Sequence, residues 1–343
     1  MSKMIAVQVA RGGGPFEVVE RPLPTPGAGQ VRLRVEACGV CHSDAMVKEG
    51  HWQGLPYPRV PGHEVVGTVE AVGPGVEGWA VGDRAGVGWH GGQCYSCHPC
   101  RKGDFAMCTT SRVTGITHDG GYASHMIAPA ESMARLPKDV DAAEAGPLLC
   151  AGLTVFNALR HTAARAGDVV AIQGIGGLGH LAVQFAAKMG FKTVAVSRGA
   201  DKRAFATQLG AHAYIDTNDG DLGEQLQALG GAKVALATAP SGAAIASLIP
   251  GLGIDGQLVI AAAPHDTITI GAMPLIMGRR SIKGWYSGVA TDSEDTIAFA
   301  AQAGVKPMIE TFKLEQAEEA YQRMITNQAR FRVVLTMDHL HGA

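Results

Sequence analysis

The sequence has no strong charge of either sign and no long apolar run, and we expect no secretory leader. Its 29 basic and 31 acidic residues leave a formal net charge of −2, so no electrostatic field attracts nucleic acid or an anionic membrane. No run of about 18 uninterrupted apolar residues is present to span a bilayer. The first residues also lack the apolar core and cleavage site of a signal peptide. We therefore expect a cytoplasmic, globular protein with no nucleic-acid and no membrane partner.

Cysteine is scarce, at seven residues, whereas glycine is abundant at 46 without the periodicity of collagen. A chain of 343 residues does not need disulfides for stability. Cytoplasmic thiols stay reduced, so clustered cysteines there indicate metal sites. Six of the seven fall into two sets with metal-ligand character. The seventh, Cys38, is interpreted as a small buried apolar residue.

The length favours two domains, and the character of the sequence changes near residue 152. Before this point, valine-rich runs at 5–9, 31–35 and 65–72 are bounded by proline and glycine, which predicts the strands of a small, partly open barrel. After it, apolar runs alternate with alanine-rich stretches, a pattern typical of βαβ units in a doubly wound parallel sheet. The predicted strands are 169–173, 193–196, 213–215, 234–237, 258–262 and 281–284, and the predicted helices are 180–189, 202–209 and 221–229.

Glycines mark the expected ends of two of these helices, since Gly190 and Gly210 stand where C-caps belong. The alternation stops near residue 292. Helices at 293–303 and 314–327 and a strand at 331–336 remain, and we expect this last segment to return to the first domain.

Cys41, His63 and Cys150 have the chemistry of a catalytic zinc site, in which three protein ligands leave a fourth position to water or substrate. The long gaps between them are compatible with this role because the fold assembles a catalytic site. Each residue alone is also compatible with a buried structural cysteine or a hydrogen-bonded core histidine. The zinc interpretation rests on two accompanying motifs, a four-cysteine cluster and a dinucleotide loop.

The cluster consists of Cys94, Cys97, Cys100 and Cys108, four thiols within fifteen residues. Such thiols can reach one tetrahedral centre, and a closed shell of four cysteines makes a zinc site structural. Two disulfides are an alternative that the missing secretory signal disfavours. A nucleic-acid-binding zinc module is another, disfavoured by the small number of basic residues nearby. We expect a structural zinc that holds the loop 92–110.

The dinucleotide loop runs through Gly174, Gly176, Gly177, Leu178 and Gly179, and it fits G-x-G-x-x-G. It follows a predicted strand and opens a predicted helix, which is the context that the motif requires. In this motif the glycines permit the turn, the approach of pyrophosphate and close helix–strand packing. The alternative is a plain strand-to-helix turn.

The residues after the second predicted strand of this domain indicate which nicotinamide cofactor is bound. An NAD-selective site places a carboxylate there, whereas this chain has Ser197 and Arg198, with Lys202 nearby. A hydroxyl and a guanidinium can hold a 2′-phosphate. We therefore predict a preference for NADP(H), with NAD(H) possible, because Asp201 can turn toward the ribose and Arg198 can be a solvated surface charge.

Taken together, these motifs resemble the zinc-dependent, medium-chain alcohol dehydrogenase family. The resemblance covers nearly the whole chain and includes Cys-Gly-Val-Cys-His-Ser-Asp at 38–44, Pro-Gly-His-Glu at 61–64 and Leu-Cys-Ala-Gly-Leu-Thr at 149–154. Gly-Trp-His-Gly-Gly at 88–92 and the Ser-Arg pair resemble its cinnamyl-alcohol-dehydrogenase-like branch. The resemblance implies an α/β protein with a GroES-like β-barrel catalytic domain from 1–151 and 289–343. It also implies a Rossmann cofactor-binding domain from 152–288.

By motif position, the resemblance implies that Cys41, His63 and Cys150 bind the catalytic zinc, with Glu64 behind the metal. Asp44 would bond the ring of His63 and fix its orientation. Ser43 would take the proton of the alcohol.

The resemblance also assigns residues to the ligands. His42 and Arg332 would face the cofactor pyrophosphate, Thr154 the nicotinamide, and Trp52 and Trp89 would line the substrate pocket.

One position departs from many family members, which carry a histidine as the outer end of a proton relay five residues after the first zinc cysteine. Here it is Met46, which cannot carry a proton. We expect Ser43 to pass its proton to the cofactor ribose and water, with His51 as an optional substitute.

The implied activity is reversible hydride transfer between a small primary or secondary alcohol and a nicotinamide cofactor, with two zinc ions per chain. A polyol dehydrogenase of the same superfamily is an alternative, although those enzymes usually have a different third zinc ligand. A non-catalytic zinc-binding interaction protein is another. Family members are homodimers or homotetramers, and the strand at 281–284 is the candidate interface.

Overall fold

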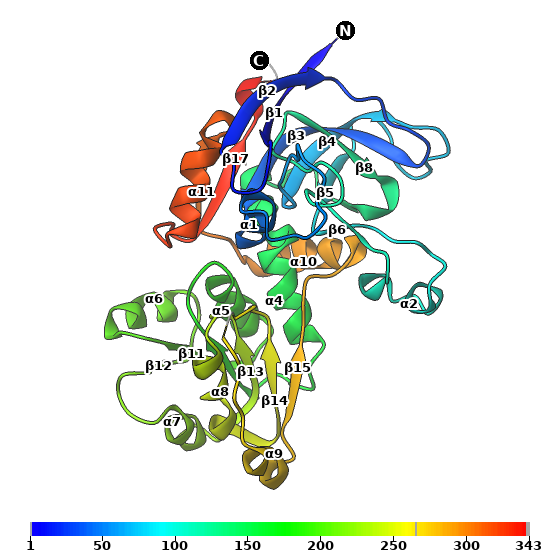
Figure 1. Ribbon diagram of the computed structural model, residues 1–343. Coiled ribbons are helices and arrows are strands. Elements are labelled where there is room, and N and C mark those ends of the chain that lie inside the picture. The colour runs from blue at the N-terminus through cyan, green and yellow to red at the C-terminus, as the bar shows by residue number, and fades with distance from the viewer. Residues whose placement is uncertain (1, 265, 341–343) are drawn as a thin grey trace. The chain divides into compact units, whose positions relative to one another are not determined.

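The computed structural model describes residues 2–264 and 266–340, and the chain divides into two compact units. The first unit contains the chain up to Leu153, Ser287–Ala298 and the segment from Pro307 on. The second contains Thr154–Tyr286 and Phe299–Lys306. Figure 1 shows the N-terminal hairpin in blue and the C-terminal strand in red within the same unit.

This division differs from the expected one by two residues at each of the boundaries near 152 and 288, and more substantially at residues 299–306, which were expected in the first domain. The physical reason is local packing within the second unit. The ring of Phe299 lies 5.0 Å from that of Phe156 and 5.9 Å from that of Phe185. The side-chain amide of Gln184 also exchanges hydrogen bonds with the backbone of Lys306.

The first unit is built on a seven-stranded sheet centred on the long strand β3 (Gln30–Val40). The C-terminal strand β17 (Arg332–Thr336) pairs antiparallel with β3, so the end of the chain returns to the first unit as predicted. The other strands of this unit are β1 (Lys3–Val9), β2 (Phe16–Pro22), β4 (Val65–Val72), β5 (Arg84–Val87), β6 (His90–Gly92), β7 (Arg112–Val113), β8 (His125–Pro129), β9 (Met133–Arg135) and β16 (Ile309–Lys313).

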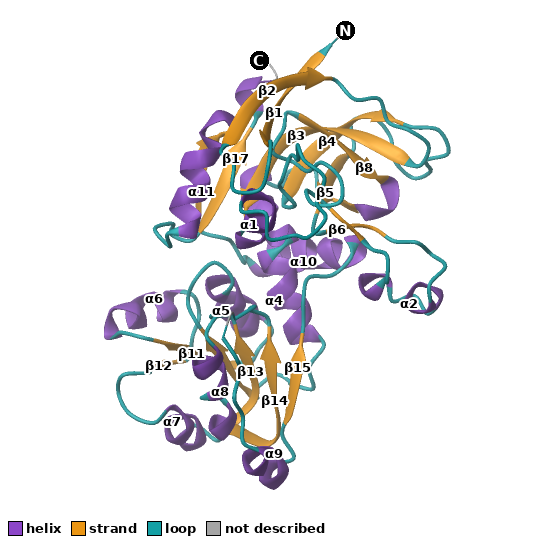
Figure 2. Ribbon diagram, in the orientation of Figure 1, coloured by secondary structure: helices purple, strands orange, loops and turns teal. Residues whose placement is uncertain are grey.

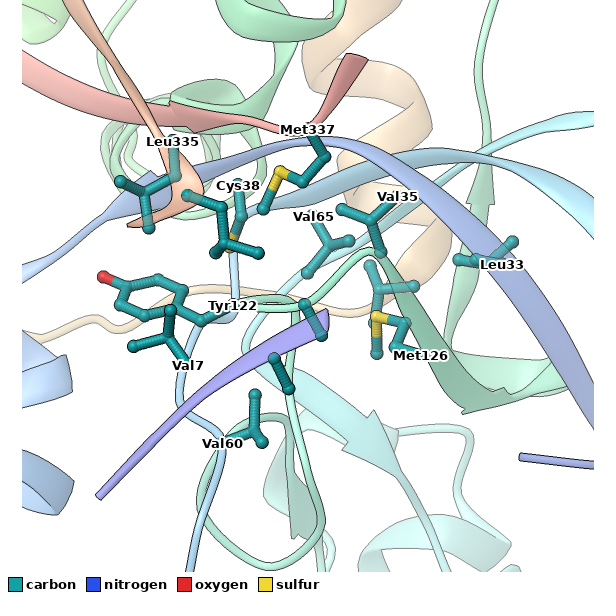
Figure 3. Close-up of a cluster of buried hydrophobic side chains, with 14 of the residues drawn as sticks. Val7, Leu33, Val35, Cys38, Val60, Val65, Tyr122, Met126, Leu335 and Met337 are labelled. Atoms are coloured by element: carbon teal, nitrogen blue, oxygen red, sulfur yellow. The ribbon is translucent and has the colours of Figure 1, made fainter. Parts of the chain in front are cut away.

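The core of this unit lies against β3 and contains mainly valine, alanine and methionine, with Tyr122 among them (Figure 3). Helix α11 (Ala317–Ile325) contributes Ala317, Ala320, Tyr321 and Met324 to it. These four positions recur at helical spacing, so one face of the helix is apolar and buried while the other carries charge.

The second unit is a six-stranded parallel sheet with the order β12-β11-β10-β13-β14-β15, which is a doubly wound topology. Figure 2 shows its strands in orange between purple helices. The strands are β10 (Val169–Gln173), β11 (Lys192–Ser197), β12 (Ala213–Asp216), β13 (Ala232–Ala237), β14 (Leu252–Ile260) and β15 (Ser281–Gly284). All six predicted strands are confirmed in type and order.

Helices follow most of these strands, and two end at the predicted glycines. Gly190 and Gly210 have φ of +83° and +101°, a region that glycine enters at little cost. The helices are α5 (Gly179–Lys188), α6 (Arg203–Gln208), α7 (Leu222–Ala228), α8 (Gly242–Ala246) and α9 (Ala272–Gly278).

The remaining helices are α1 (Ala45–Lys48), α2 (His98–Arg101), α3 (Ala142–Ala145), α4 (Ala151–Arg160) and α10 (Ala290–Ala303). Within the described residues no single helix has the length and apolarity to cross a membrane, although the bent pair Ala142–Leu149 and Ala151–Arg160 passes on those two criteria alone.

Candidate active site

A tight turn at the end of β3 carries the first predicted zinc ligand. Strand β3 ends at Val40, and Cys41 precedes a single 3-10 turn, His42–Asp44. The backbone N–H of Cys41 donates to Oδ2 of Asp44 at 2.9 Å. A side chain that bonds its own turn in this way fixes the backbone that carries the thiol.

The fold brings Cys41, His63, Glu64 and Cys150 together, with their potential ligand atoms within 4.8 Å of one another. The two sulfurs, 109 residues apart in sequence, lie 3.9 Å from each other. A tetrahedral zinc ion with about 2.3 Å bonds to sulfur separates two thiolates by about 3.8 Å. The donor set and its spacing therefore fit zinc.

His63 makes the contact with Asp44 that the family resemblance implied. Its Nδ1 lies 3.2 Å from Oδ1 of Asp44, and the ring packs edge-on against Trp89 with centroids 5.0 Å apart. The other nitrogen, Nε2, is buried and has no hydrogen-bond partner in the described part of the chain. A buried polar atom without a partner is costly, and a metal ion would satisfy it.

The thiols are poised for the same role. A hydrogen bond from Cys150, together with His63 and Arg332, holds the pKa of Cys41 well below its ordinary value despite burial. The pKa of Cys150 is raised, because its proton is shared with the Cys41 sulfur and because it is buried. The metal-binding form of a cysteine is the thiolate, and the lowered pKa of Cys41 favours that form.

Glu64 lies behind this group in a buried ion pair with Arg332. Its Oε1 accepts from the guanidinium, whereas Oε2 is buried without a partner among residues 2–264 and 266–340. Burial raises the pKa of Glu64 to about 7, although Arg332 opposes the shift. Arg332 also donates to the carbonyl of Val40 at 3.3 Å, so within the protein it holds Glu64 and the end of β3. Its contact with the cofactor pyrophosphate stays a prediction.

The predicted substrate-pocket residues border one apolar cluster. Trp52, Trp89 and Met46 pack against Val47 and Ile116. The remaining predicted residues of the first unit are Ser43, which is half-buried, and His42 and His51, which are exposed.

The four-cysteine loop forms a second group, with its sulfurs within 4.8 Å of one another. Cys97 and Cys108 are 4.0 Å apart, again close to the edge of a tetrahedral zinc–sulfur site. Hydrogen bonds from Ser96, and then from the backbone of Cys97, lower the pKa of Cys94 to about 5. All four cysteines are free thiols in the structure.

The geometry of the dinucleotide loop shows what three of its glycines contribute. Gly174 has φ of +91°, which permits the turn. A Cβ at Gly179 would lie 1.8 Å from the carbonyl oxygen of Gly174, whereas a Cβ at Gly176 would meet nothing within 4 Å. Gly179 is therefore a packing glycine, and Gly176 faces open space where a ligand can approach. Thr154 lies in the same unit and is buried in α4.

The turn after β11 places the predicted selectivity residues at the carboxyl edge of the sheet. Lys202 donates to the hydroxyl of Ser197 at 3.4 Å, and Arg198 is exposed. Sequence reasoning missed Asp216, which pairs in register with Ser197 and accepts from the N–H of Gly199 at 2.9 Å. Hydrogen bonds from the backbone of Asn218 and Gly199 lower the pKa of Asp216. Its carboxylate is therefore used to hold the turn.

Two further residues near the first metal group were not predicted. Gly39 is one, because a Cβ there would lie 1.8 Å from Oε2 of Glu64. Tyr122 is the other, since its hydroxyl donates to Oδ2 of Asp44 at 3.0 Å from 78 residues away. Burial keeps the pKa of Tyr122 well above its ordinary value, so the hydroxyl remains a donor. Of these two residues, only Gly39 could have been noticed in the sequence, because it lies next to the predicted zinc ligand Cys41.

Comparison with known proteins gives consistent matches along the chain. Residues 27–138 match the family described as alcohol dehydrogenase GroES-like domain, and residues 177–302 match the family described as zinc-binding dehydrogenase. The alcohol dehydrogenase notN of an Aspergillus species is 47% identical over 326 residues, covering 95% of this chain and 96% of that protein. The alcohol dehydrogenase patD of Penicillium expansum is 46% identical, covering 97% of each.

A solved structure extends the similarity to three dimensions. A cinnamyl alcohol dehydrogenase from Sorghum bicolor superposes with a TM-score of 0.88 at 30% identity, covering 98% of both chains.

Proposed function

Because this chain belongs to the zinc-dependent, medium-chain alcohol dehydrogenase family, we propose that it catalyses reversible hydride transfer between a small primary or secondary alcohol and a nicotinamide cofactor. The observation that carries this proposal is the convergence of two cysteine sulfurs and an unpartnered, buried histidine nitrogen. A zinc ion held by Cys41, His63 and Cys150 would supply positive charge that lowers the pKa of an alcohol hydroxyl.

Residues around this group position it and handle the proton. Asp44 holds the ring of His63 so that Nε2 is available to a metal. Arg332 neutralises Glu64, whose free Oε2 can approach the metal when a ligand exchanges. The Ser43 hydroxyl takes the alcohol proton, and because Met46 cannot relay it, the proton passes to the cofactor ribose and water, with His51 optional. Trp52 and Trp89 make the substrate side apolar.

The second unit is proposed to bind the cofactor, with pyrophosphate at Gly176 and the N-terminus of α5. The nicotinamide would exchange the hydride with the alcohol carbon. NADP(H) is preferred, because Ser197, Arg198 and Lys202 offer a hydroxyl and two cations to a 2′-phosphate, and because Asp216 is occupied by the turn backbone. The four-cysteine loop would hold the second, structural zinc.

A kinetic matrix of NADP⁺ and NAD⁺ against short, aromatic and allylic alcohols, and of the reduced cofactors against the aldehydes, tests this function. We expect turnover of primary alcohols with a higher kcat/KM for NADP⁺. Turnover of polyols alone would favour a polyol dehydrogenase, although Cys150 as third ligand argues against that. No turnover with any pair would favour a zinc-binding interaction protein.

A substitution at Arg198 tests the proposed preference for NADP(H). Replacing Arg198 with leucine is expected to lower kcat/KM for NADP⁺ about tenfold and to leave that for NAD⁺ unchanged, since one charge-assisted contact is worth about 1.4 kcal/mol or more. Arg165→Leu is the matched control, because Arg165 is exposed and precedes β10 at the opposite edge of the sheet. An NAD⁺ advantage in the unmodified enzyme contradicts the preference.

We propose that the protein assembles as a homodimer or homotetramer through the edge strand β15. This strand pairs on one side with β14 and has exposed residues throughout. Large apolar side chains stand exposed near it, namely Ile254, Met273, Ile276, Met277, Ile282 and Tyr286. Apolar surface next to an open strand edge is typical of an interface between identical subunits. Light scattering should give the mass of an oligomer, and Ile282→Pro should reduce it; a monomer in the unmodified protein contradicts the assignment.

A further inference from the structure

We propose that Tyr122 is a positioning residue for the catalytic metal group, acting through Asp44 on both His63 and Cys41. The inference rests on the proposed zinc site, because it concerns how firmly this chain holds that metal. Tyr122 itself does not reach the ligand atoms, and its hydroxyl meets Asp44 instead.

The carboxylate of Asp44 is the common partner of the two ligand-bearing segments. Its Oδ1 lies 3.2 Å from Nδ1 of His63, and its Oδ2 accepts from the N–H of Cys41 at 2.9 Å. The Tyr122 hydroxyl is the third donor, at 3.0 Å from the same Oδ2. Asp44 is 2% exposed, so water cannot replace a lost donor without entering the core. A buried carboxylate is stable only while its donors are in place.

The ring of Tyr122 is held firmly enough to fix the position of its hydroxyl. It is fully buried and lies beside Val7 among the aliphatic side chains of the core, with the hydroxyl at the edge of the cluster (Figure 3). A Cβ at Gly62 would lie 2.4 Å from the ring, so the tyrosine packs directly on the residue before His63. Phe16 covers it from another side, with ring centroids 6.0 Å apart.

The backbone of Tyr122 is tied to the same histidine segment. The N–H of Tyr122 donates to the carbonyl of Pro61, and that of Gly121 to the carbonyl of Gly62, both at 3.0 Å. The segment 120–122 therefore runs alongside the residues that lead into His63. Tyr122 joins this segment to the Cys41 turn through a single hydroxyl, so removing that hydroxyl should loosen both ligands together.

The protein also contains a closely matched control tyrosine. Tyr321 is 1% exposed, packs against the same Phe16 ring, and donates its hydroxyl to a carboxylate, Oε1 of Glu49, at 3.0 Å. Its hydroxyl is hydrogen-bonded to Glu49 and not to Asp44, although burial, Glu49 and, less strongly, the charge of Asp44 raise the pKa of Tyr321. Tyr122→Phe and Tyr321→Phe therefore each remove one tyrosine hydroxyl that is hydrogen-bonded to a carboxylate. Only Tyr122→Phe takes a hydrogen bond away from Asp44.

The test measures the rate at which the purified, zinc-loaded protein transfers its two metal ions to a chromogenic chelator. Mutating a residue that is hydrogen-bonded directly to a metal ligand typically lowers metal affinity 10- to 100-fold. Tyr122 acts one step further out, so Tyr122→Phe should release the metal of the Cys41 group about tenfold faster. The four-cysteine loop in the same molecule serves as internal reference and should release its metal at the unmodified rate in both variants. Tyr321→Phe should leave both rates unchanged.

A double-mutant cycle makes the route through Asp44 testable. If Tyr122 acts through Asp44, adding Tyr122→Phe to Asp44→Asn should not accelerate release further. Equal release rates in Tyr122→Phe and the unmodified protein would overturn the inference, as would additive effects with Asp44→Asn or an equal acceleration in Tyr321→Phe. If the unmodified protein carries no metal at Cys41, His63 and Cys150, the proposed function fails before the variants are compared, so the two failures are distinguishable.

Discussion

Replacing His63 with alanine should lower alcohol oxidation by about 10³-fold or more and reduce the bound zinc from two ions per chain to one. The change removes one of three proposed ligands and leaves Asp44 without its ring partner. A Lewis-acidic metal contributes several kcal/mol to stabilising negative oxygen, and each 1.4 kcal/mol or so is a factor of ten in rate. Metal analysis by mass spectrometry and initial rates on the same preparation measure both effects.

The control for this experiment is a histidine in the same unit that has a carboxylate neighbour and belongs to neither of the two cysteine-containing groups. His125 meets this requirement, since its Nε2 lies 3.6 Å from Glu70 and its Nδ1 is 3.0 Å from the Ser124 hydroxyl. His125→Ala should keep two zinc ions and most of the activity. If His63→Ala retains two ions and an undiminished rate, the trio does not bind the catalytic metal.

The parts of the site that could be predicted from the sequence are those whose chemistry is carried by residue type alone. Two cysteines and a histidine that are far apart in the sequence share a function mainly when they bind the same metal ion, so these three residues could be predicted. The contact between Asp44 and His63 could be predicted from the family motif. Tyr122 could not be predicted in this way. Its hydroxyl reaches Asp44 across the core from a bend that precedes β8. The sequence around a buried tyrosine does not show whether its hydroxyl has a partner.

The fold shows the same distinction between local and distant information. The valine-rich strands β4 and β10 lie at their predicted positions. Strand β10 is buried on both faces, which produces a continuous apolar run, whereas β4 was predicted from its valines and is fully buried mainly in its first half. Strands β2 and β16 were not predicted, since they lie at sheet edges, alternate with charged residues and depend on partners elsewhere in the chain. Strand β14 begins six residues earlier than expected, where a register shift and the left-handed Asp255 interrupt the pattern.

The cofactor turn combines both kinds of information. The glycine loop is local and was predicted together with its strand and helix. The turn after β11 is instead held by residues of the following strand, β12. Asp216 accepts from the N–H of Gly199, and the hydroxyl of Tyr214 donates to the carbonyl of that glycine. Reading only the end of β11 for a carboxylate therefore overlooks an acidic residue that stands beside Ser197 in the sheet.

Replacing Gly176 with valine should weaken NADPH binding about 100-fold while leaving the thermal unfolding temperature within about a degree of the unmodified protein. A side chain at this position meets nothing within 4 Å in the protein and Gly176 does not require a left-handed φ, so folding has little to lose. The same side chain would occupy the space through which pyrophosphate approaches the backbone. A loss of about 2.7 kcal/mol of binding corresponds to 100-fold in Kd. Fluorescence titration with NADPH and a thermal melt measure the two quantities.

Gly179→Ala is the opposing variant, because its methyl group would lie 1.8 Å from the carbonyl oxygen of Gly174. It should lower the unfolding temperature by several degrees, since strand and helix must separate to admit the methyl group. The two glycines belong to one motif, but the two substitutions should differ in effect. Gly176→Val should lower NADPH affinity alone, whereas Gly179→Ala should mainly lower the unfolding temperature. Unchanged NADPH affinity in Gly176→Val would mean that the pyrophosphate does not lie against this loop, and the assignment of the cofactor to it would be wrong.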